Sequence, residues 1–114
     1  MVMLRGEIWW ASLPDPEGSS PGYRRPVLIV QANAFNKSLI NTVVVAALMS
    51  NLTLAMAPGN VLAKARRSGL PKDSVINVSQ LLTLDKQFLT QRIKMLDAQT
   101  LQEVNRGLQL VLGF

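Results

Sequence analysis

The chain has 114 residues, enough for one domain with a single hydrophobic core. Nearly half of the residues, 48%, are hydrophobic, which argues against disorder, while the best apolar run, residues 43–49, is far shorter than the roughly 20 residues that cross a bilayer. Twelve Lys and Arg against seven Asp and Glu give a net charge of +5, which favours polyanions, chiefly nucleic acid, although the same charge could serve only solubility.

The chain contains no cysteine and no histidine. The lack of cysteine excludes disulfide scaffolds, zinc ribbons and thiol nucleophiles. Together with an N-terminus unlike a signal peptide, it predicts a cytoplasmic protein with no membrane partner. The lack of histidine excludes nucleases that use a pair of His side chains as acid and base. Because the acidic residues are scattered, a two-metal nuclease is also disfavoured, and we expect no metal and no cofactor.

The N-terminal part of the chain predicts two strands joined by a loop. Residues 6–13 are rich in β-favouring side chains and predict a first strand. Residues 14–22 are dense in Pro, Gly and Ser and predict a loop that is too long for a tight hairpin turn. Residues 25–31 predict a second strand whose Val-Leu-Ile-Val run is buried on both faces. Pro26 is then expected at its first position, where a missing N–H is tolerated.

The middle of the chain predicts a central strand followed by shorter elements. The run at residues 42–49 predicts the central strand, and shorter strands are expected around residues 52–56 and 60–63. Residues 64–73 combine basic side chains with turn-forming residues and predict a basic loop. Residues 74–79 alternate apolar and polar side chains, as a half-buried strand does.

The C-terminal part predicts a short helical turn at residues 83–87, a last strand at residues 92–96 and then a helix. Asp97 is a suitable N-cap for a helix that runs to about Leu112, and Gly113 follows at a C-cap position. Apolar residues recur along this helix at helical spacing and predict a stripe for the core or for a subunit contact: Leu101, Val104, Leu108, Val111 and Leu112.

Together these elements predict a mainly β fold of the α+β class, with one domain over residues 1–114. We expect a compact curved sheet or small barrel with one C-terminal helix, and no series of βαβ units. Trp9 and Trp10 fall on opposite faces of the first strand, so at least one is expected in the core. Trp9 is the better candidate for the core, while Trp10 could stack on a nucleobase or fill a subunit interface.

Three segments resemble the MazF/PemK toxin family and together span nearly the whole chain. Residues 5–10 (RGEIWW) are similar to the family's N-terminal strand, and residues 22–30 (GYRRPVLIV) to its G-x-x-RPVLVV segment. Residues 73–80 (DSVINVSQ), with TLDK at 83–86, are similar to its DSVI…Q…T-x-D-K region. Each match is short, but their order and spacing make the resemblance specific.

The resemblance implies a small SH3-like barrel of the MazF/CcdB/Kid type that forms a homodimer. It also implies an endoribonuclease that cleaves single-stranded messenger RNA at short sequences. The implied partner is a cognate MazE-like antitoxin, whose disordered tail wraps the toxin and blocks its RNA site.

The family's main catalytic arginine corresponds to Arg25, the residue before Pro26, and not to Arg24. RNA carries its own nucleophile, because the 2′-hydroxyl can attack the adjacent phosphate and leave a 2′,3′-cyclic phosphate without a metal ion. A guanidinium suits this reaction because its rigid and permanently charged fork matches phosphate oxygens. Loss of one such donor typically costs on the order of 10²–10³ in rate.

Residues 46–51 (AALMSN) depart from the family's A-x-(L/I)-T-S-N-like pattern, because Met49 stands where the catalytic threonine is expected. A thioether cannot donate a hydrogen bond or relay a proton. Ser50 is the candidate replacement, provided that a bulge or the strand end turns its side chain inward. Slow cleavage, a different proton donor or loss of catalysis would each be consistent with this departure.

Other side chains are candidates for RNA binding, each with a structural alternative. Basic side chains could follow the RNA phosphates or be ordinary solvated charges: Arg24, Lys64, Arg66, Arg67 and Lys72. The amide of Gln80 could read a base edge or simply end a strand. Trp10 is included as a stacking candidate.

Two other functions stay open on the sequence alone. A CcdB-like protein of the same fold could inhibit DNA gyrase through contacts near its C-terminal helix, and the apolar end Leu112-Gly113-Phe114 is compatible with that. An RNA-binding homologue that has lost catalysis through Met49 is the second. The Arg25-Pro26 segment favours the ribonuclease over the gyrase inhibitor.

Overall fold

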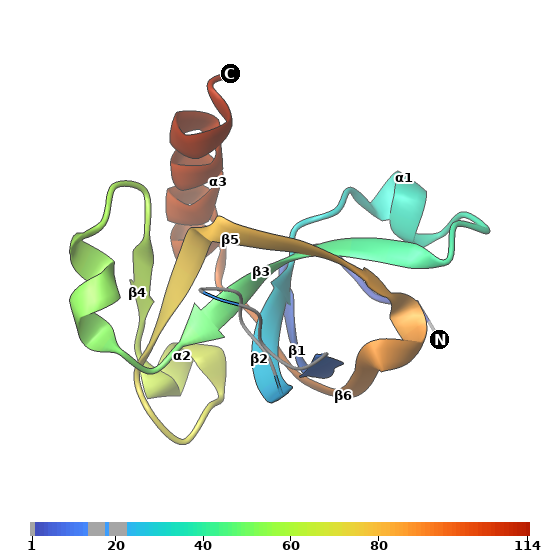
Figure 1. The fold of residues 1–114 in the computed structure, drawn as a ribbon, viewed down its shortest axis with the longest axis horizontal. Coiled ribbons are helices and arrows are strands. Elements are labelled where there is room, and N and C mark those ends of the chain that lie inside the picture. The colour runs from blue at the N-terminus through green and yellow to red at the C-terminus, as the bar shows by residue number, and fades with distance from the viewer. Residues whose placement is uncertain (1, 14–17, 19–22) are drawn as a thin grey trace.

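The computed structural model of this protein describes residues 2–13, 18 and 23–114. Six strands form one antiparallel sheet in the order β4-β5-β3-β2-β1-β6, and helix α3 rises from it (Figure 1). The strands are β1 (Glu7–Leu13), β2 (Tyr23–Ile29), β3 (Thr42–Met49), β4 (Val61–Ala63), β5 (Ser74–Asp85) and β6 (Leu89–Met95). The helices are α1 (Asn33–Asn36), α2 (Ala65–Ser68) and α3 (Ala98–Leu112), with 3-10 turns η1 (Leu52–Met56) and η2 (Lys86–Phe88). This architecture confirms the predicted fold class.

The sheet carries one apolar cluster on each face. Ile8 and Leu28 belong to the cluster that packs against α3 through Val104, whereas Trp9 and Val27 belong to the opposite cluster. Because successive strand residues point to opposite faces, neighbours such as Ile8 and Trp9 contribute to different clusters. The burial of β2 on both faces and the core position of Trp9, which is 2% exposed, are therefore confirmed.

A bulge divides β5 into two halves. Ala46 of β3 pairs with Leu81, whereas Ala47 pairs with Asn77, so residues 78–80 lie between two registers. The Asn60 side-chain oxygen accepts a hydrogen bond from the backbone N–H of Val78 there, at 3.0 Å. Bulges bend a strand and increase its twist, and β5 turns away from its first direction in Figure 1. The bend lets the first half of β5 pair with β4 while the second half follows β3.

Helix α3 begins and ends where the sequence predicts. The Asp97 carboxylate accepts a hydrogen bond from the N–H of Thr100 at 3.0 Å, and Gly113 ends the helix with a φ of 80°. Val104 in the predicted stripe is fully buried, but Leu112 near its end is 56% exposed. The stripe is therefore core in its first half and surface in its second. None of the helices in the described part of the chain is long and apolar enough to span a membrane.

Two predicted elements are wrong. Residues 52–56 form the turn η1 instead of a strand, because the Asn51 side chain accepts a hydrogen bond from the N–H of Thr53 at 3.2 Å and caps a turn. The helical turn predicted at residues 83–87 is largely strand, because β5 pairs with β3 as far as Asp85. The turn η2 begins immediately after that residue, at Lys86. The basic segment 64–73, predicted as a loop, also contains the short helix α2.

Pro26 lies inside β2 and not at its first position. The strand begins at Tyr23, because it pairs with β1 from there, whereas β3 joins it only from Val27 onward. Pro26 therefore precedes the doubly paired part of the strand, where a missing N–H costs no bond to β3. At the far edge, β6 begins at Leu89, three positions before the predicted start. The predicted loop at residues 14–22 lies outside the described residues, apart from Gly18.

Candidate active site

The start of β2 places two consecutive arginines on opposite faces of the sheet. Ser12 of β1 lies opposite Arg24, and Ala11 lies opposite Arg25. Cross-strand partners share a face, and successive residues alternate between faces. Because β3 does not pair with this end of β2, both arginines keep access to solvent: Arg24 is exposed and Arg25 is half-buried.

A pocket of about 220 Å³ lies at this end of the sheet. Its walls come from β1, β2, the end of β3 and the segment that leads into β5. The lining residues are Trp10, Arg24, Arg25, Pro26, Leu48, Ser50, Leu70, Pro71, Lys72 and Ser74. Three of these side chains are cations, and none of the lining residues that the structure describes is acidic. The pocket therefore favours an anionic ligand.

Arg24 is held against Trp10. The guanidinium carbon of Arg24 lies 4.0 Å from the centroid of the indole ring, which is cation–π geometry. Trp10 is half-buried and also packs against the apolar cluster that contains Ile8 and Leu28. The ring is thus anchored from within the protein, and Arg24 is positioned over it at the pocket.

Arg25 is a cation without a protein acceptor for its inner N–H. Its Nε atom is buried and makes no hydrogen bond within the described part of the chain. Buried donors without an acceptor are uncommon in folded proteins, so this guanidinium is a candidate for an interaction beyond the described chain.

The two carboxylates in the described ion pairs are bound by cations outside the pocket. Glu7 pairs with Arg92, and Asp97 pairs with Arg67 at 2.9 Å. Burial alone would raise the pKa of Glu7, but hydrogen bonds from the Leu4 N–H, Arg92 and the Trp9 indole outweigh it and lower that pKa. Both carboxylates are therefore held ionised by partners outside the pocket, and among the described ion pairs none involves a cation of the pocket.

The end of β3 brings Ser50 to the pocket. The strand ends at Met49, and Ser50 is the exposed residue that follows it directly. Leu48 and Ser50 line the pocket, whereas Met49 does not belong to its described lining. Ser50 is expected to reach the site only if a bulge or the strand end turns its side chain inward. The strand does end directly before Ser50.

The segment that leads into β5 forms the opposite wall. Asp73 fastens this wall to α2, because its carboxylate accepts a hydrogen bond from the N–H of Ala65 at 2.8 Å. The hydroxyl of Ser74 makes only a long contact of 3.4 Å with the Lys72 carbonyl oxygen. From the sequence, Lys72 is assigned only to a basic rim and Ser74 has no role. The similarity of residues 73–80 to a family motif is the only signal for this wall.

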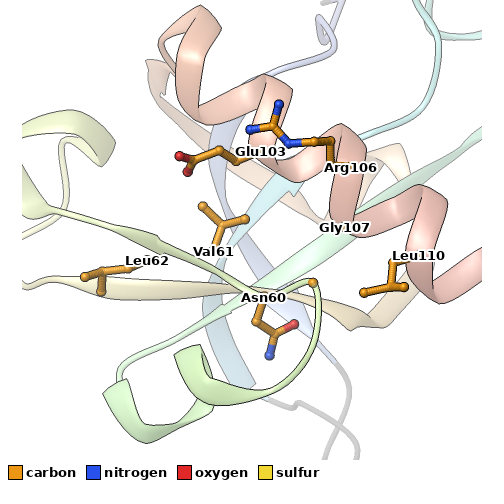
Figure 2. A pocket seen from close by; sticks show the side chains of 8 residues that line it. Asn60, Val61, Leu62, Glu103, Arg106, Gly107 and Leu110 are labelled. Atoms are coloured by element: carbon orange, nitrogen blue, oxygen red, sulfur yellow. The ribbon is translucent and has the colours of Figure 1, made fainter.

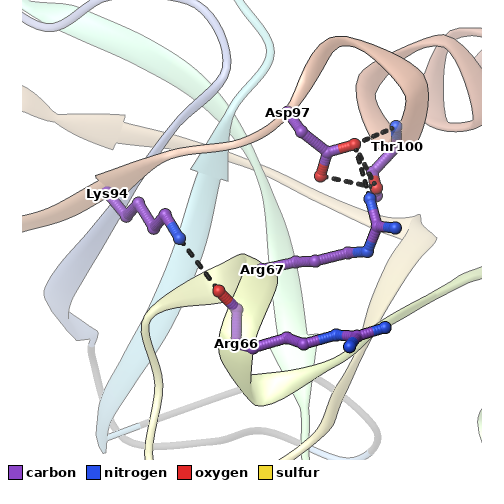
Figure 3. A network of polar contacts seen from close by, with 5 residues as sticks. All are labelled: Arg66, Arg67, Lys94, Asp97 and Thr100. Atoms are coloured by element: carbon purple, nitrogen blue, oxygen red, sulfur yellow. Dashed lines mark hydrogen bonds and ion pairs between the residues drawn. The ribbon is translucent and has the colours of Figure 1, made fainter.

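The remaining basic candidates lie outside the pocket. Figure 3 shows the Arg67 guanidinium directed at the Asp97 carboxylate, and Lys94 donating to the Arg66 carbonyl oxygen at 2.9 Å. Lys64 occupies the N-cap position of α2 without a side-chain hydrogen bond to the helix, and both Lys64 and Arg66 have exposed side chains. The structure therefore brings together Arg24, Arg25, Trp10 and Ser50, and does not bring Lys64, Arg66 or Arg67 to the same pocket.

Gln80 is also separate from the pocket, since it lies half-buried in the bulge of β5. A second groove, of about 390 Å³, runs between α3 and the start of β4 (Figure 2). Its lining includes Glu103 and Arg106 on the helix and Leu62 on the strand. It shares no lining residue with the arginine pocket and contains none of the predicted site residues.

The comparisons with known proteins cover almost the whole chain and are consistent with one another. Residues 4–112 match the family described as PemK-like, MazF-like toxin of type II toxin–antitoxin system. Endoribonuclease MazF6 of Mycobacterium tuberculosis is 47% identical over 112 residues, which cover 98% of either chain. The crystal structure of MazF from Deinococcus radiodurans has a TM-score of 0.83 at 23% identity and covers 100% of this chain and 99% of that one. An endoribonuclease in complex with its cognate antitoxin, from a mycobacterial species, has a TM-score of 0.74 at 24% identity, with coverages of 99% and 95%.

Proposed function

This chain belongs to the family of PemK-like, MazF-like toxins of type II toxin–antitoxin systems, and on that basis we propose that it is a toxin that acts as an endoribonuclease. A relative with 47% identity along almost the whole chain is named an endoribonuclease, which supports the activity. The observation that carries the proposal in this molecule is Arg25, whose buried Nε has no acceptor within the described chain. A permanent cation with an unused donor is suited to a phosphate oxygen.

The substrate is single-stranded messenger RNA, cleaved at short sequences without a metal ion. The 2′-hydroxyl gives its proton to water as its oxygen attacks the adjacent phosphorus, the bond from phosphorus to the 5′-oxygen breaks, and that 5′-oxygen takes up a proton. The products carry a 2′,3′-cyclic phosphate and a 5′-hydroxyl. Arg25 donates to the phosphate oxygens, whose negative charge grows in the transition state.

The Ser50 hydroxyl relays a proton to the departing 5′-oxygen, since it donates its own proton and takes one up from water. Its place just beyond the end of β3, in the lining of the same pocket as Arg25, supports this role. A serine hydroxyl both donates and accepts hydrogen bonds, whereas the Met49 thioether offers no donor.

The RNA strand extends from this pocket over the basic side chains. Trp10 and Arg24 bind it next to Arg25, because they line the same pocket. Lys64 and Arg66 are exposed and contact phosphates further along. Arg67 contributes less, since its charge is already paired with Asp97. Gln80 contacts the RNA only if the RNA strand passes over the bulge of β5, because Gln80 lies in that bulge.

A gyrase inhibitor is not favoured, because the relatives of this chain are named endoribonucleases. We therefore propose no role in DNA binding. The partner is a cognate antitoxin of the MazE kind with a disordered tail that covers the RNA site, by analogy with the related endoribonuclease solved with its cognate antitoxin. Toxin and antitoxin meet in the cytoplasm.

The toxin acts as a homodimer, and an apolar groove of about 520 Å³ supports this. Phe35 of α1 and Leu112 of α3 line the groove and are 60% and 56% exposed, and Phe114 beside them is 77% exposed. Helices α1 and α3 rise on the same side of the sheet in Figure 1. Exposed apolar side chains in one groove can pack against the same side chains of a second copy across a two-fold axis, so we propose a second copy as the occupant.

The test of the activity is cleavage of a mixed-sequence RNA in the presence of EDTA, with both fragment ends mapped. We expect discrete cuts with 2′,3′-cyclic phosphate ends, and a loss of about 10²–10³-fold in rate for Arg25→Ala. Arg106→Ala is the matched control, because it removes one exposed arginine far along α3 from the pocket.

Well-folded protein that binds RNA without cutting it would overturn the enzymatic proposal and identify the degenerate RNA-binding homologue. Gyrase inhibition without RNA binding would instead identify the CcdB-like alternative. Cleavage that persists in Arg25→Ala would leave the activity intact but remove Arg25 from its catalytic role.

A further inference from the structure

The backbone that carries Ser50 is firmly held on one side only. Ser50 is exposed, so the position of its hydroxyl depends on the chain before and after it. Before it lies β3, which is paired with β5 as far as Met49. After it lies the turn η1, none of whose residues is buried. The place of the hydroxyl in the arginine pocket therefore depends on what fastens η1 to the rest of the protein.

One amide side chain fastens η1 to the sheet. The Asn60 Nδ2 group donates to the Leu54 carbonyl oxygen at 2.9 Å, and Asn60 Oδ1 accepts from the N–H of Val78 at 3.0 Å. Since one end of an amide only donates and the other only accepts, these two partners fix its orientation. Figure 2 shows the Asn60 side chain at the start of β4, directed away from α3. Val78 is fully buried, so the amide links an exposed turn to a buried point of β5.

No second attachment of this kind exists in the described part of the chain. There, the hydrogen bonds that join residues 51–57 to residues outside that segment all end at Asn60. Besides its side chain, the Asn60 N–H donates to the Ala57 carbonyl oxygen at 3.2 Å. The other hydrogen bonds of the segment are internal, such as that from the Thr53 N–H to the Asn51 side chain. An exposed segment with few outside bonds opens easily, so the Asn60 amide decides how well it is held.

We propose that Asn60 is a positioning residue of the cleavage reaction, which holds the backbone that presents the Ser50 hydroxyl to the RNA. A proton donor must lie within hydrogen-bond reach of the oxygen that it serves, and a misplacement of about 1 Å can cost about 10²-fold in rate. Asn60 does not belong to the described lining of the arginine pocket, so it acts through the turn and not by contact with the reacting atoms. The inference rests on the proposed ribonuclease function.

The first test is Asn60→Asp, measured in single turnovers at saturating concentrations of an RNA with one mapped cleavage site. An aspartate keeps an oxygen for the Val78 N–H, but it puts a second oxygen against the Leu54 carbonyl oxygen and repels it. We expect the rate at saturation to fall by about 10- to 10²-fold, with a much smaller change in RNA affinity. Asn105→Asp is the matched control, because Asn105 is also half-buried and its side-chain oxygen accepts from Arg5, away from the pocket. It should cut at the wild-type rate.

The double variant with Ser50→Ala shows whether Asn60 acts through Ser50. If it does, Asn60→Asp slows the reaction no further once the hydroxyl is gone, because coupled sites are not additive. Losses that multiply in the double variant would instead indicate added charge or a generally loosened fold, and they would overturn the proposal. A wild-type rate in Asn60→Asp, or in Ser50→Ala alone, would overturn it as well.

Amide hydrogen exchange tests the attachment without RNA. In Asn60→Asp we expect faster exchange at the N–H groups of Leu54 and Ala57, which bond within the turn segment, and unchanged protection at Val78. Unchanged exchange at all three would overturn the attachment. A wild type that cuts no RNA overturns the ribonuclease, while faster exchange would still support the attachment of η1. A wild type that cuts, together with an Asn60→Asp variant that cuts equally well, overturns only the role of Asn60.

Discussion

At the scale of single residues, the neighbours of each arginine separate structural charges from available ones. Arg67 and Arg92 each pair with a carboxylate, while Arg24 lies over an indole and Arg25 keeps a buried donor without an acceptor. Arginines that are neighbours in the sequence can differ in this respect: of Arg66 and Arg67, only Arg67 is paired with a carboxylate. A net charge of +5 therefore overstates the charge that an RNA can use.

The role of Ser50 can be tested by removing its hydroxyl. We expect Ser50→Ala to lower the single-turnover cleavage rate by about 10²-fold, because general acid catalysis typically contributes on the order of 10²–10⁴. Ser79→Ala is the matched control, since Ser79 is exposed in the bulge of β5 and its hydroxyl only donates to Asn77. If Ser50→Ala cuts at the wild-type rate and Met49→Thr cuts faster, the proton donor belongs to position 49 and not to Ser50.

Glu7 makes stability depend on pH. Its folded-state pKa is lowered, so the stability it contributes is present above its unfolded pKa of about 4.3 and is lost as the pH falls through the folded value. We expect the free energy of unfolding to fall below about pH 5, and Glu7→Gln to show a shallower fall and a loss of about 1–3 kcal/mol at neutral pH. Urea denaturation between acidic and neutral pH measures both.

Asp97 also contributes to the loss of stability in acid. Its pKa is lowered chiefly by the Thr100 N–H, with further contributions from the Thr100 hydroxyl and Arg67. Glu103→Gln is the control for Glu7→Gln, because it removes a carboxylate that is exposed on α3. An acid slope in Glu7→Gln as steep as that of the wild type would contradict the contribution of Glu7.

At the scale of elements, the sequence predicts those whose signal is local. The central strand β3 and helix α3 match their predicted bounds, because an unbroken apolar run and a capped periodic stripe need no knowledge of partners. The sequence predicts a helical turn at residues 83–87, but residues 83–85 are strand because they pair with β3 beyond the bulge. The turn η1 was mistaken for a strand, because the Asn51 cap outweighs the strand-like composition of the residues after it.

The candidate site likewise contains residues that the sequence could identify and residues that it could not. Arg25 and Ser50 could be chosen from the sequence, because a family motif marks the first and a strand end marks the second. The far wall could not, because Leu70 and Ser74 reach the pocket only through the anchoring of Asp73 to α2. Sequence proximity also suggested one basic rim where the structure has separate groups of cations.

The contact between α3 and the start of β4 depends on two glycines. A Cβ atom at Gly107 would lie 2.1 Å from the carbonyl oxygen of Gly59, a backbone atom that cannot swing away. We expect Gly107→Ala to destabilise the fold by about 1–3 kcal/mol, because α3 must shift from the sheet. Urea denaturation measures this loss.

Gly113→Ala is the comparison for that variant, because a Cβ there meets nothing within 4 Å and the cost comes only from its φ of 80°. That cost is about 1–2 kcal/mol for a residue with a side chain in the left-handed region. Gly107→Ala with wild-type stability would mean that α3 and the Gly59 loop separate freely in solution. RNA cleavage by the folded variants is expected to be unchanged, since the arginine pocket lies elsewhere.

At the scale of the whole molecule, several of the apolar side chains that this chain leaves exposed line one groove. The groove between α1 and the end of α3 is lined by Phe35, Leu112 and Phe114, all more than half exposed. A single copy cannot cover this surface, because α3 already packs its buried residues against the sheet. Pairing of two copies would bury it and would place two arginine pockets in one particle.

The expected result is a dimeric mass for the wild type at micromolar concentration, measured by sedimentation. Leu112→Lys should shift the protein toward the monomer, because a buried unpaired ammonium opposes association at an apolar interface. Leu39→Lys is the matched control: Leu39 is 99% exposed and does not line the groove, so its replacement should leave the mass unchanged. A monomeric wild type, or equal effects of the two substitutions, would place the dimer contact elsewhere or remove it.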